Sequence, residues 1–175
     1  MGPESSMSVI RLLIEYGADV NAESFFQGSP LHRAVRLRLP DVAEFLLENG
    51  ANVNMGAADD GTPVQLAALM GFPGMICLLL KHGANVNTTS NKCGPPLQAA
   101  IETGSLGCVK LLLENGADAS LQSGEGYPNA LEKARRCWEG NQNWKRREIF
   151  ELIQDCFEER GFLEIHDYPM LGSEY

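Results

Sequence analysis

The chain has 175 residues, of which 44% are hydrophobic, enough apolar material for one domain with a core of ordinary size. Its formal net charge of −9 argues against a nucleic-acid partner, because such proteins displace phosphate counterions with lysine and arginine. The five cysteines lack CxxC spacing and predict free thiols in an intracellular protein, cytoplasmic or nuclear, while the lack of a signal peptide or long apolar segment argues against a membrane.

Two short motifs recur along the chain in one register. The first reads Gly-Ala-Asp-Val-Asn or a close variant, and the second places proline before an apolar residue and a downstream alanine. Two motifs that share one period indicate internal repeats. The first motif begins at Gly17, Gly50, Gly83 and Gly116, each 33 residues after the one before, and the second at Ser29, Thr62 and Pro95.

A helical apolar pattern lies between the motifs. Its leucines are Leu13, Leu46, Leu79 and Leu112, each with an apolar residue four positions earlier. Each unit therefore predicts a helix that begins near the proline, a short connection, a second and more apolar helix, and a loop. The glycine of the first motif suits the position after a helix C-terminus. We expect the four leucines to form a continuous buried spine.

The shared period, the proline motif and the capping glycine resemble the ankyrin repeat over roughly residues 6 to 160. The resemblance implies an all-α fold, an α-solenoid of stacked helix-turn-helix units with β-turn loops. It places three complete repeats at residues 23–55, 56–88 and 89–121.

The N-terminal residues 1–22 predict half a repeat. Its helix, Met7 to Tyr16, corresponds to a second helix that lacks its first helix, so its apolar face has no neighbour. One interpretation is that the chain is a fragment of a longer array, since terminal repeats need a polar cap. The other is a homodimer that forms through this uncapped end.

Residues 122–162 predict an atypical capping repeat, followed by an extended tail over residues 163–175. We expect its first helix over Tyr127–Cys137, a connection over Trp138–Asn143 and an amphipathic helix over Trp144–Arg160.

The last of these helices has an unfavourable charge order. Lys145, Arg146 and Arg147 occupy its first turn, where the helix dipole favours acidic groups. A structural neighbour such as Glu139, or an acidic group of a partner, is expected to compensate them.

Candidate partner-binding residues follow from the resemblance, which implies contacts through the loop tips and the exposed side of the first helices. The apolar ones are expected to form a single exposed patch, unless the two phenylalanines fold back and become buried. The candidates are Phe25, Phe26, Arg36, Leu37, Asp59, Leu69, Met70, Lys92, Glu102 and Arg136.

The sequence contains no convincing catalytic constellation, metal site or cofactor motif. His32 occupies the histidine position of the proline motif, where the resemblance implies that it ties adjacent loops together. Asn21, Asn54 and Asn87 resemble the asparagines that hydroxylases modify in ankyrin proteins, so the chain is a candidate substrate.

We therefore expect a non-catalytic scaffold module that binds a protein or peptide through its concave face and β-turn tips. The acidic balance predicts a neutral or basic partner surface. The alternatives are an enzyme or small-molecule binder that uses an apolar pocket in the groove, and a structural spacer in a multidomain protein.

Overall fold

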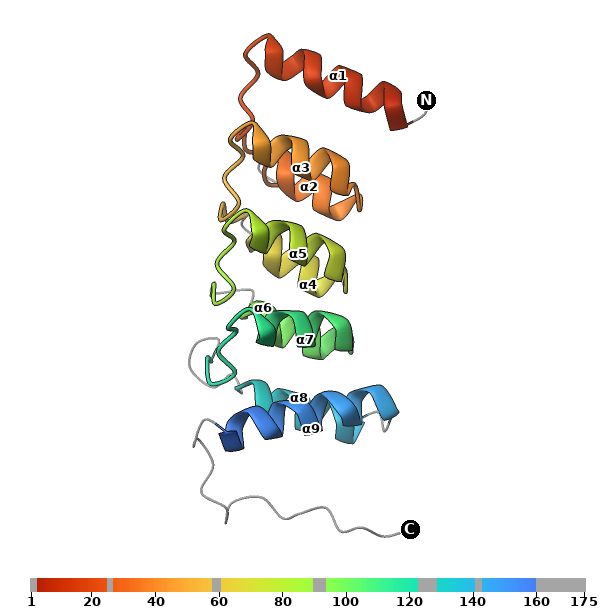
Figure 1. Cartoon of the computed structure of the whole chain (residues 1–175), viewed down its shortest axis with the longest axis vertical. Coiled ribbons are helices and arrows are strands. Elements are labelled where there is room, and N and C mark those ends of the chain that lie inside the picture. The colour runs from red at the N-terminus through yellow and green to blue at the C-terminus, as the bar shows by residue number, and fades with distance from the viewer. Residues whose placement is uncertain are drawn as a thin grey trace.

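The helices stack in a single column (Figure 1). The computed structural model describes residues 3–24, 27–57, 61–89, 94–122, 129–140 and 143–159, with the backbone alone for residues 3–6. This part of the chain contains no strand and only two isolated β-bridges, so the predicted all-α class is confirmed. Its helices are α1 (Pro3–Glu15), α2 (Pro30–Arg36), α3 (Pro40–Glu48), α4 (Pro63–Leu69), α5 (Pro73–Lys81), α6 (Pro96–Thr103), α7 (Leu106–Glu114), α8 (Ala130–Gly140) and α9 (Trp144–Glu159).

From α2 onward, the helices pack in pairs that form two layers. Within each pair α2 contacts α3, α4 contacts α5, α6 contacts α7 and α8 contacts α9. The first helices α2, α4, α6 and α8 contact one another along one layer, and α3, α5, α7 and α9 do so along the other. The remaining helix, α1, lies beside α3 at the N-terminal end of the column (Figure 1).

The helix boundaries follow the expected chemistry. The first helices α2, α4 and α6 begin at prolines, where the missing N–H would have no intrahelical partner. Prolines also begin the second helices α3 and α5. The motif glycines adopt positive φ angles, such as +88° at Gly50 and +85° at Gly83, which avoids the steric cost of a side chain.

The predicted leucine spine is correct for three of its four members. Leu46, Leu79 and Leu112 are 3%, 0% and 0% exposed. The prediction for Leu13 is wrong, because its side chain is 55% exposed. Each buried leucine belongs to a helix paired with the first helix of its own repeat, whereas no helix in the described part of the chain covers this side of α1.

The C-terminal pair differs from its prediction in the bounds of α8. This helix begins at Ala130 rather than at Tyr127, because the Asn129 side chain caps it by accepting the Glu132 N–H at 2.9 Å. It also continues past Cys137 to Gly140, and Trp138, expected in a connection, instead stacks on Phe150 of α9 with ring centroids 5.7 Å apart.

An asparagine ladder joins the loops of successive repeats. The Asn21 amide nitrogen donates to the Gly50 carbonyl oxygen at 3.1 Å, and its amide oxygen accepts the Asn52 N–H at 2.7 Å. Asn54 and Asn87 make the equivalent pair of bonds to the next repeat. Each asparagine therefore bridges two repeats with both ends of its side chain. The hydroxylation of these asparagines stays a prediction.

A second ladder runs through the buried polar residues of the first helices. His32 Nε2 lies 3.0 Å from the Gly61 carbonyl oxygen, while its Nδ1 accepts the Ser29 N–H at 3.2 Å. The Nδ1 bond requires an unprotonated nitrogen there, so Nε2 carries the proton and donates it to Gly61. Gln65 makes the corresponding bond to the Gly94 carbonyl oxygen at 2.8 Å, and Gln98 donates to the Leu121 carbonyl oxygen, at a different position of the loop, at 3.0 Å. The predicted structural role of His32 is confirmed.

Candidate partner-binding surface

The described candidates from the first helices lie at the C-terminal ends of these helices. Arg36 and Leu69 are the last residues of α2 and α4, and Leu37 and Met70 are the residues that follow. Glu102 holds the same register position in α6 as Arg36 and Leu69 do in theirs. Because neighbouring first helices pack side by side, these positions form a line along the stack.

We call Leu37, Leu69 and Met70 the apolar row. Leu37 and Leu69 are 52% and 51% exposed, whereas Met70 is partly buried against the core. The buried residues of α2 and α4 lie elsewhere on these helices, so the core does not require leucine at either exposed position. The row is an apolar surface at one edge of the repeats.

Arg38 stands beside the apolar row, and the sequence analysis did not select it. Its Nη2 donates to the Met70 carbonyl oxygen at 2.6 Å, and its guanidinium lies 5.2 Å from the Phe72 ring centroid. Its φ angle is +56°, a left-handed conformation that the next two repeats fill with Gly71 and Gly104. In the sequence, the sign of this unusual backbone was an arginine at a position that glycine occupies in the next two repeats.

The C-terminal end of the line carries ion pairs. Glu102 forms an ion pair with Lys133, whose Nζ lies 3.1 Å from the Glu102 Oε2. Arg136, a candidate on α8, is bound to Glu132 at 2.8 Å through its Nε. Both candidates are exposed, and they place paired charges rather than apolar groups at this end.

Arg146 is stabilised at its unfavourable position by backbone carbonyl groups that the sequence did not indicate. Its guanidinium donates to the Glu102 carbonyl oxygen at 3.2 Å and to the Cys137 carbonyl oxygen at 3.3 Å. Both carbonyls belong to the last turns of helices, where a cation is favourable. The expectation that Glu139 would compensate the basic turn is wrong, because Glu139 pairs with Arg135 at 3.0 Å.

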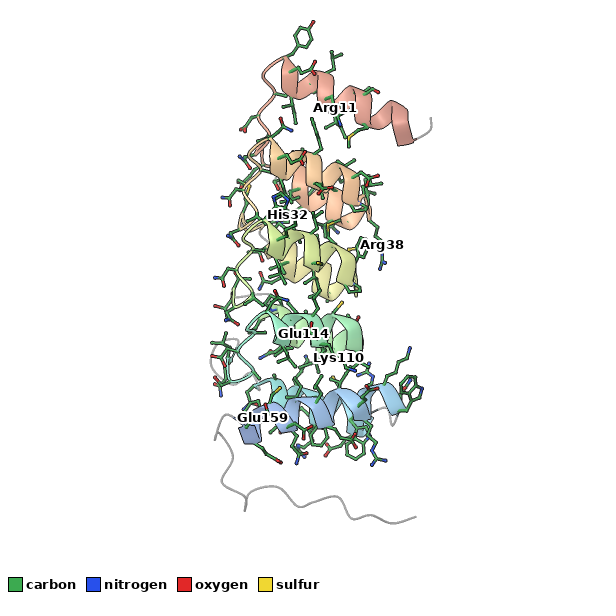
Figure 2. The ribbon with its side chains drawn as sticks, in the orientation of Figure 1. Arg11, His32, Arg38, Lys110, Glu114 and Glu159 are labelled. Atoms are coloured by element: carbon green, nitrogen blue, oxygen red, sulfur yellow. The ribbon has the colours of Figure 1, made fainter. Side chains whose placement is uncertain are left out.

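The predicted loop-tip candidates Phe25, Phe26, Asp59 and Lys92 lie outside the described residues. The bases of the first two loops are described, because β-bridges join Ser24 to Gly28 and Ala57 to Gly61 before α2 and α4. A seven-residue helix, about 10 Å long, separates these bases from the apolar row. In Figure 2, His32 marks the end of the repeats near the loops, and Arg38 marks the opposite end near the helix turns.

The two acidic groups with shifted pKa values have structural explanations. Burial raises the pKa of the Cys108 thiol, with weaker opposing effects of a Ser105 hydrogen bond and the Arg38 charge. A hydrogen bond from Arg135 lowers the pKa of the Glu132 carboxyl. Partial burial opposes this effect, whereas a hydrogen bond from Arg136 and the charges of both arginines lower the pKa further. Cys108 is therefore held as a thiol, unlike an activated nucleophile.

The described residues contain neither a metal-binding group nor a membrane-spanning helix. In the ranges that the structure describes, no three His, Cys, Asp or Glu side chains are arranged to hold a metal ion. Across the same ranges, every helix is too short or too polar to cross a bilayer.

Comparison with protein families gives one match. A family model described as ankyrin repeats (3 copies) matches residues 4–57 and 50–123, which together cover more than half of the chain. No curated protein matches the chain significantly. Ankyrin repeats are generally protein–protein interaction modules. With its 33-residue period, paired helices and inter-repeat ladders, the chain belongs to the ankyrin repeat family.

Proposed function

We propose that the chain is a non-catalytic, intracellular module that binds a protein or peptide partner through its first helices and β-turn tips. The observation that carries this proposal is the apolar row, whose two leucines are half exposed where the fold does not need them. Apolar anchors surrounded by polar groups are the usual source of affinity in protein interfaces. Free thiols at the four described cysteines support the intracellular assignment.

The charged residues differ between the two ends of the proposed surface. Arg36 and Arg38 flank Leu37 at the N-terminal end, whereas at the C-terminal end the Glu102 carboxylate is paired with Lys133. The net charge of −9 favours a neutral or basic partner overall, with one acidic group of that partner beside the arginines. We expect association to slow as salt is added, because charge steering is screened.

Photo-crosslinking tests the proposed surface. Benzoylphenylalanine is placed at Leu69 in one variant and at Lys81 in another, and both are irradiated in lysate before mass spectrometry. Lys81 is also exposed but lies at the end of α5, in the layer of second helices. The proposal predicts one defined partner crosslinked from position 69 and absent from position 81. The same partner crosslinked equally from both positions would contradict it.

A further inference from the structure

The turn that follows α2 holds an arginine where the fold does not need one. Arg38 has a φ angle of +56°, and the equivalent residues of the next two repeats, Gly71 and Gly104, have φ angles of +60° and +69°. The hydrogen bond of the turn is the same with either residue. The Arg38 N–H donates to the Val35 carbonyl oxygen at 3.0 Å, and the Gly71 N–H donates to the Ala68 carbonyl oxygen at 3.0 Å. Glycine would therefore form this turn without the steric cost of a side chain.

The Arg38 side chain places its charge on the next repeat. Its Nη2 donates to the Met70 carbonyl oxygen at 2.6 Å, and its guanidinium lies 5.2 Å from the Phe72 ring centroid. In Figure 2, this side chain extends from the turn after α2 toward α4 and α5. Because Met70 is a member of the apolar row, the two contacts hold the guanidinium beside that row.

The repeat that receives this guanidinium contributes no charge of its own. Residues 61–80, which include α4 and all of α5 except Lys81, contain no charged side chain. Glu102, at the end of the next first helix, is paired with Lys133. In the part of the chain that the structure describes, Arg38 forms no ion pair. Its side chain is exposed, so a cation without a counter-charge among these residues lies beside an apolar surface.

A capping role for the last turn of α4 does not account for the whole environment of Arg38. Arg146 caps helix ends by donating to the carbonyl oxygens of both Glu102 and Cys137, and it is partly buried. Arg38 is exposed, and within the described ranges it donates to the Met70 carbonyl oxygen alone. Since a guanidinium has several N–H donors in a planar fork, Arg38 keeps the capacity to bind a further acceptor.

The segment around Arg38 is basic, although the chain as a whole is acidic. Residues 24–40 contain three arginines and no acidic residue, in a chain with a net charge of −9. A single carboxylate is attracted to this local positive charge. A long acidic segment is disfavoured, because the rest of the chain repels it. The charge distribution therefore favours one acidic group close to the apolar row.

We propose that Arg38 determines the specificity of the apolar row by binding an acidic side chain of the partner. This inference rests on the function proposed for that row. The partner presents a short segment in which an aspartate or glutamate lies close to a large apolar residue. The carboxylate accepts charge-assisted hydrogen bonds from Arg38, while the apolar residue contacts Leu37 and Leu69. Because Met70 and Phe72 already hold the guanidinium, little side-chain entropy is lost on binding.

Selection from a displayed library of short random peptides, with the full chain as bait, tests this inference. The expected result is enrichment of peptides that carry an acidic residue within a few positions of a large apolar one. Each enriched peptide is then synthesised with its acidic residue and with the corresponding amide, and both affinities are measured by fluorescence polarisation. Loss of the peptide carboxylate should weaken binding to the unmodified chain about tenfold or more.

Variants of the chain show whether Arg38 is the group that binds this carboxylate. In Arg38→Gly, which copies the turn of the next two repeats, amide replacement in the peptide should change the affinity less than about twofold. Arg147→Gln is the matched control, because it removes the same charge from an exposed arginine of α9 and should keep the full effect. Circular dichroism checks the folding of each variant. Arg38→Gln is the second test if Arg38→Gly loses helix content.

The possible outcomes separate this inference from the function on which it rests. Enriched peptides that lose affinity for Leu69→Ser but contain no acidic residue would overturn the inference and leave the apolar row as a binding surface. An acidic preference that persists in both Arg38 variants would overturn it in the same way. A selection in which no peptide depends on Leu69 would also overturn it. Crosslinking from position 69 then decides separately whether the row binds a protein.

Discussion

The Arg38 guanidinium donates to the Met70 carbonyl oxygen at 2.6 Å and so ties the turn of one repeat to the end of the next first helix. This bond is made by a residue with a φ angle of +56°, which costs a side-chain-bearing residue about 1–2 kcal/mol. The hydrogen bond and the Phe72 contact offset that cost.

Substitution of Arg38 should separate these two effects. Arg38→Ala loses both contacts and keeps the backbone strain, so we expect the free energy of unfolding to fall by about 1–2 kcal/mol. Arg38→Gly loses the same contacts but relieves the strain, so its cost should be less than about 1 kcal/mol. Urea unfolding followed by circular dichroism measures both variants. Equal destabilisation by the two substitutions would show that the conformation carries no strain.

Asn54, a member of the asparagine ladder, should contribute more to stability than Ser120, the residue at the equivalent position in the last copy of the motif. Asn54→Ala removes the bonds to Gly83 and Asn85 and should lower the free energy of unfolding by about 1–2 kcal/mol. Ser120 occupies the same register position in the last copy, and among the described residues its bonds go to Asp118 in its own loop. Ser120→Ala is the control and should cost less, as measured by urea unfolding. The reverse order would contradict an inter-repeat role for Asn54.

His32 should be replaceable by glutamine. Gln65 holds the same position in the next repeat and makes the equivalent bond, to the Gly94 carbonyl oxygen, so His32→Gln should cost less than about 1 kcal/mol. His32→Leu should cost about 1–3 kcal/mol, because the buried Ser29 N–H loses its acceptor. Thermal unfolding compares the two variants. A larger loss for glutamine than for leucine would mean that the ladder bond is unimportant.

The thiols of Cys77 and Cys108 should differ in reactivity. Cys77 is exposed on α5, whereas Cys108 is buried in α7 with a raised pKa. We expect rapid alkylation of Cys77 by maleimide and modification of Cys108 only under unfolding conditions, with the sites assigned by mass spectrometry. Equal rates in the native protein would place Cys108 at the surface.

The raised pKa of Cys108 also sets the direction of a pH effect. The folded state holds this proton more tightly than the unfolded state, so the thiol's contribution is complete below its unfolded pKa. That contribution is lost as the pH rises through the higher pKa of the folded state. The free energy of unfolding should therefore fall above about pH 9, less steeply in Cys108→Ala, as alkaline urea titrations would measure.

Most of the fold could be predicted from the sequence because the repeat places the same physical signals at each step. Prolines begin the first helices, glycines end the second helices, and a leucine of each complete repeat enters the core. The exposure of Leu13 could not be predicted in this way. The 33-residue period shows which residues of different repeats are equivalent, but the burial of each one depends on whether a neighbouring helix is present.

Less of the candidate site could be predicted. The register selected Leu37 and Leu69, and the structure places both at exposed helix ends. It did not select Arg38, because the contact with Met70 depends on a left-handed backbone that an arginine rarely adopts. Similarly, the Arg146 side chain reaches the Glu102 carbonyl oxygen because the fold brings the start of α9 near the end of α6, a tertiary relationship that local sequence does not contain.

The most direct test of the central claim is the affinity for the crosslinked partner after apolar side chains are removed from each surface. Leu37→Ser with Leu69→Ser should weaken binding at least about tenfold, equivalent to about 1.4 kcal/mol, by calorimetry. Val9→Ser with Leu12→Ser removes a similarly exposed pair from α1 and should leave the affinity unchanged. Unchanged affinity in the first double variant, or an equal loss in both, would contradict the assignment of the apolar row as the binding surface.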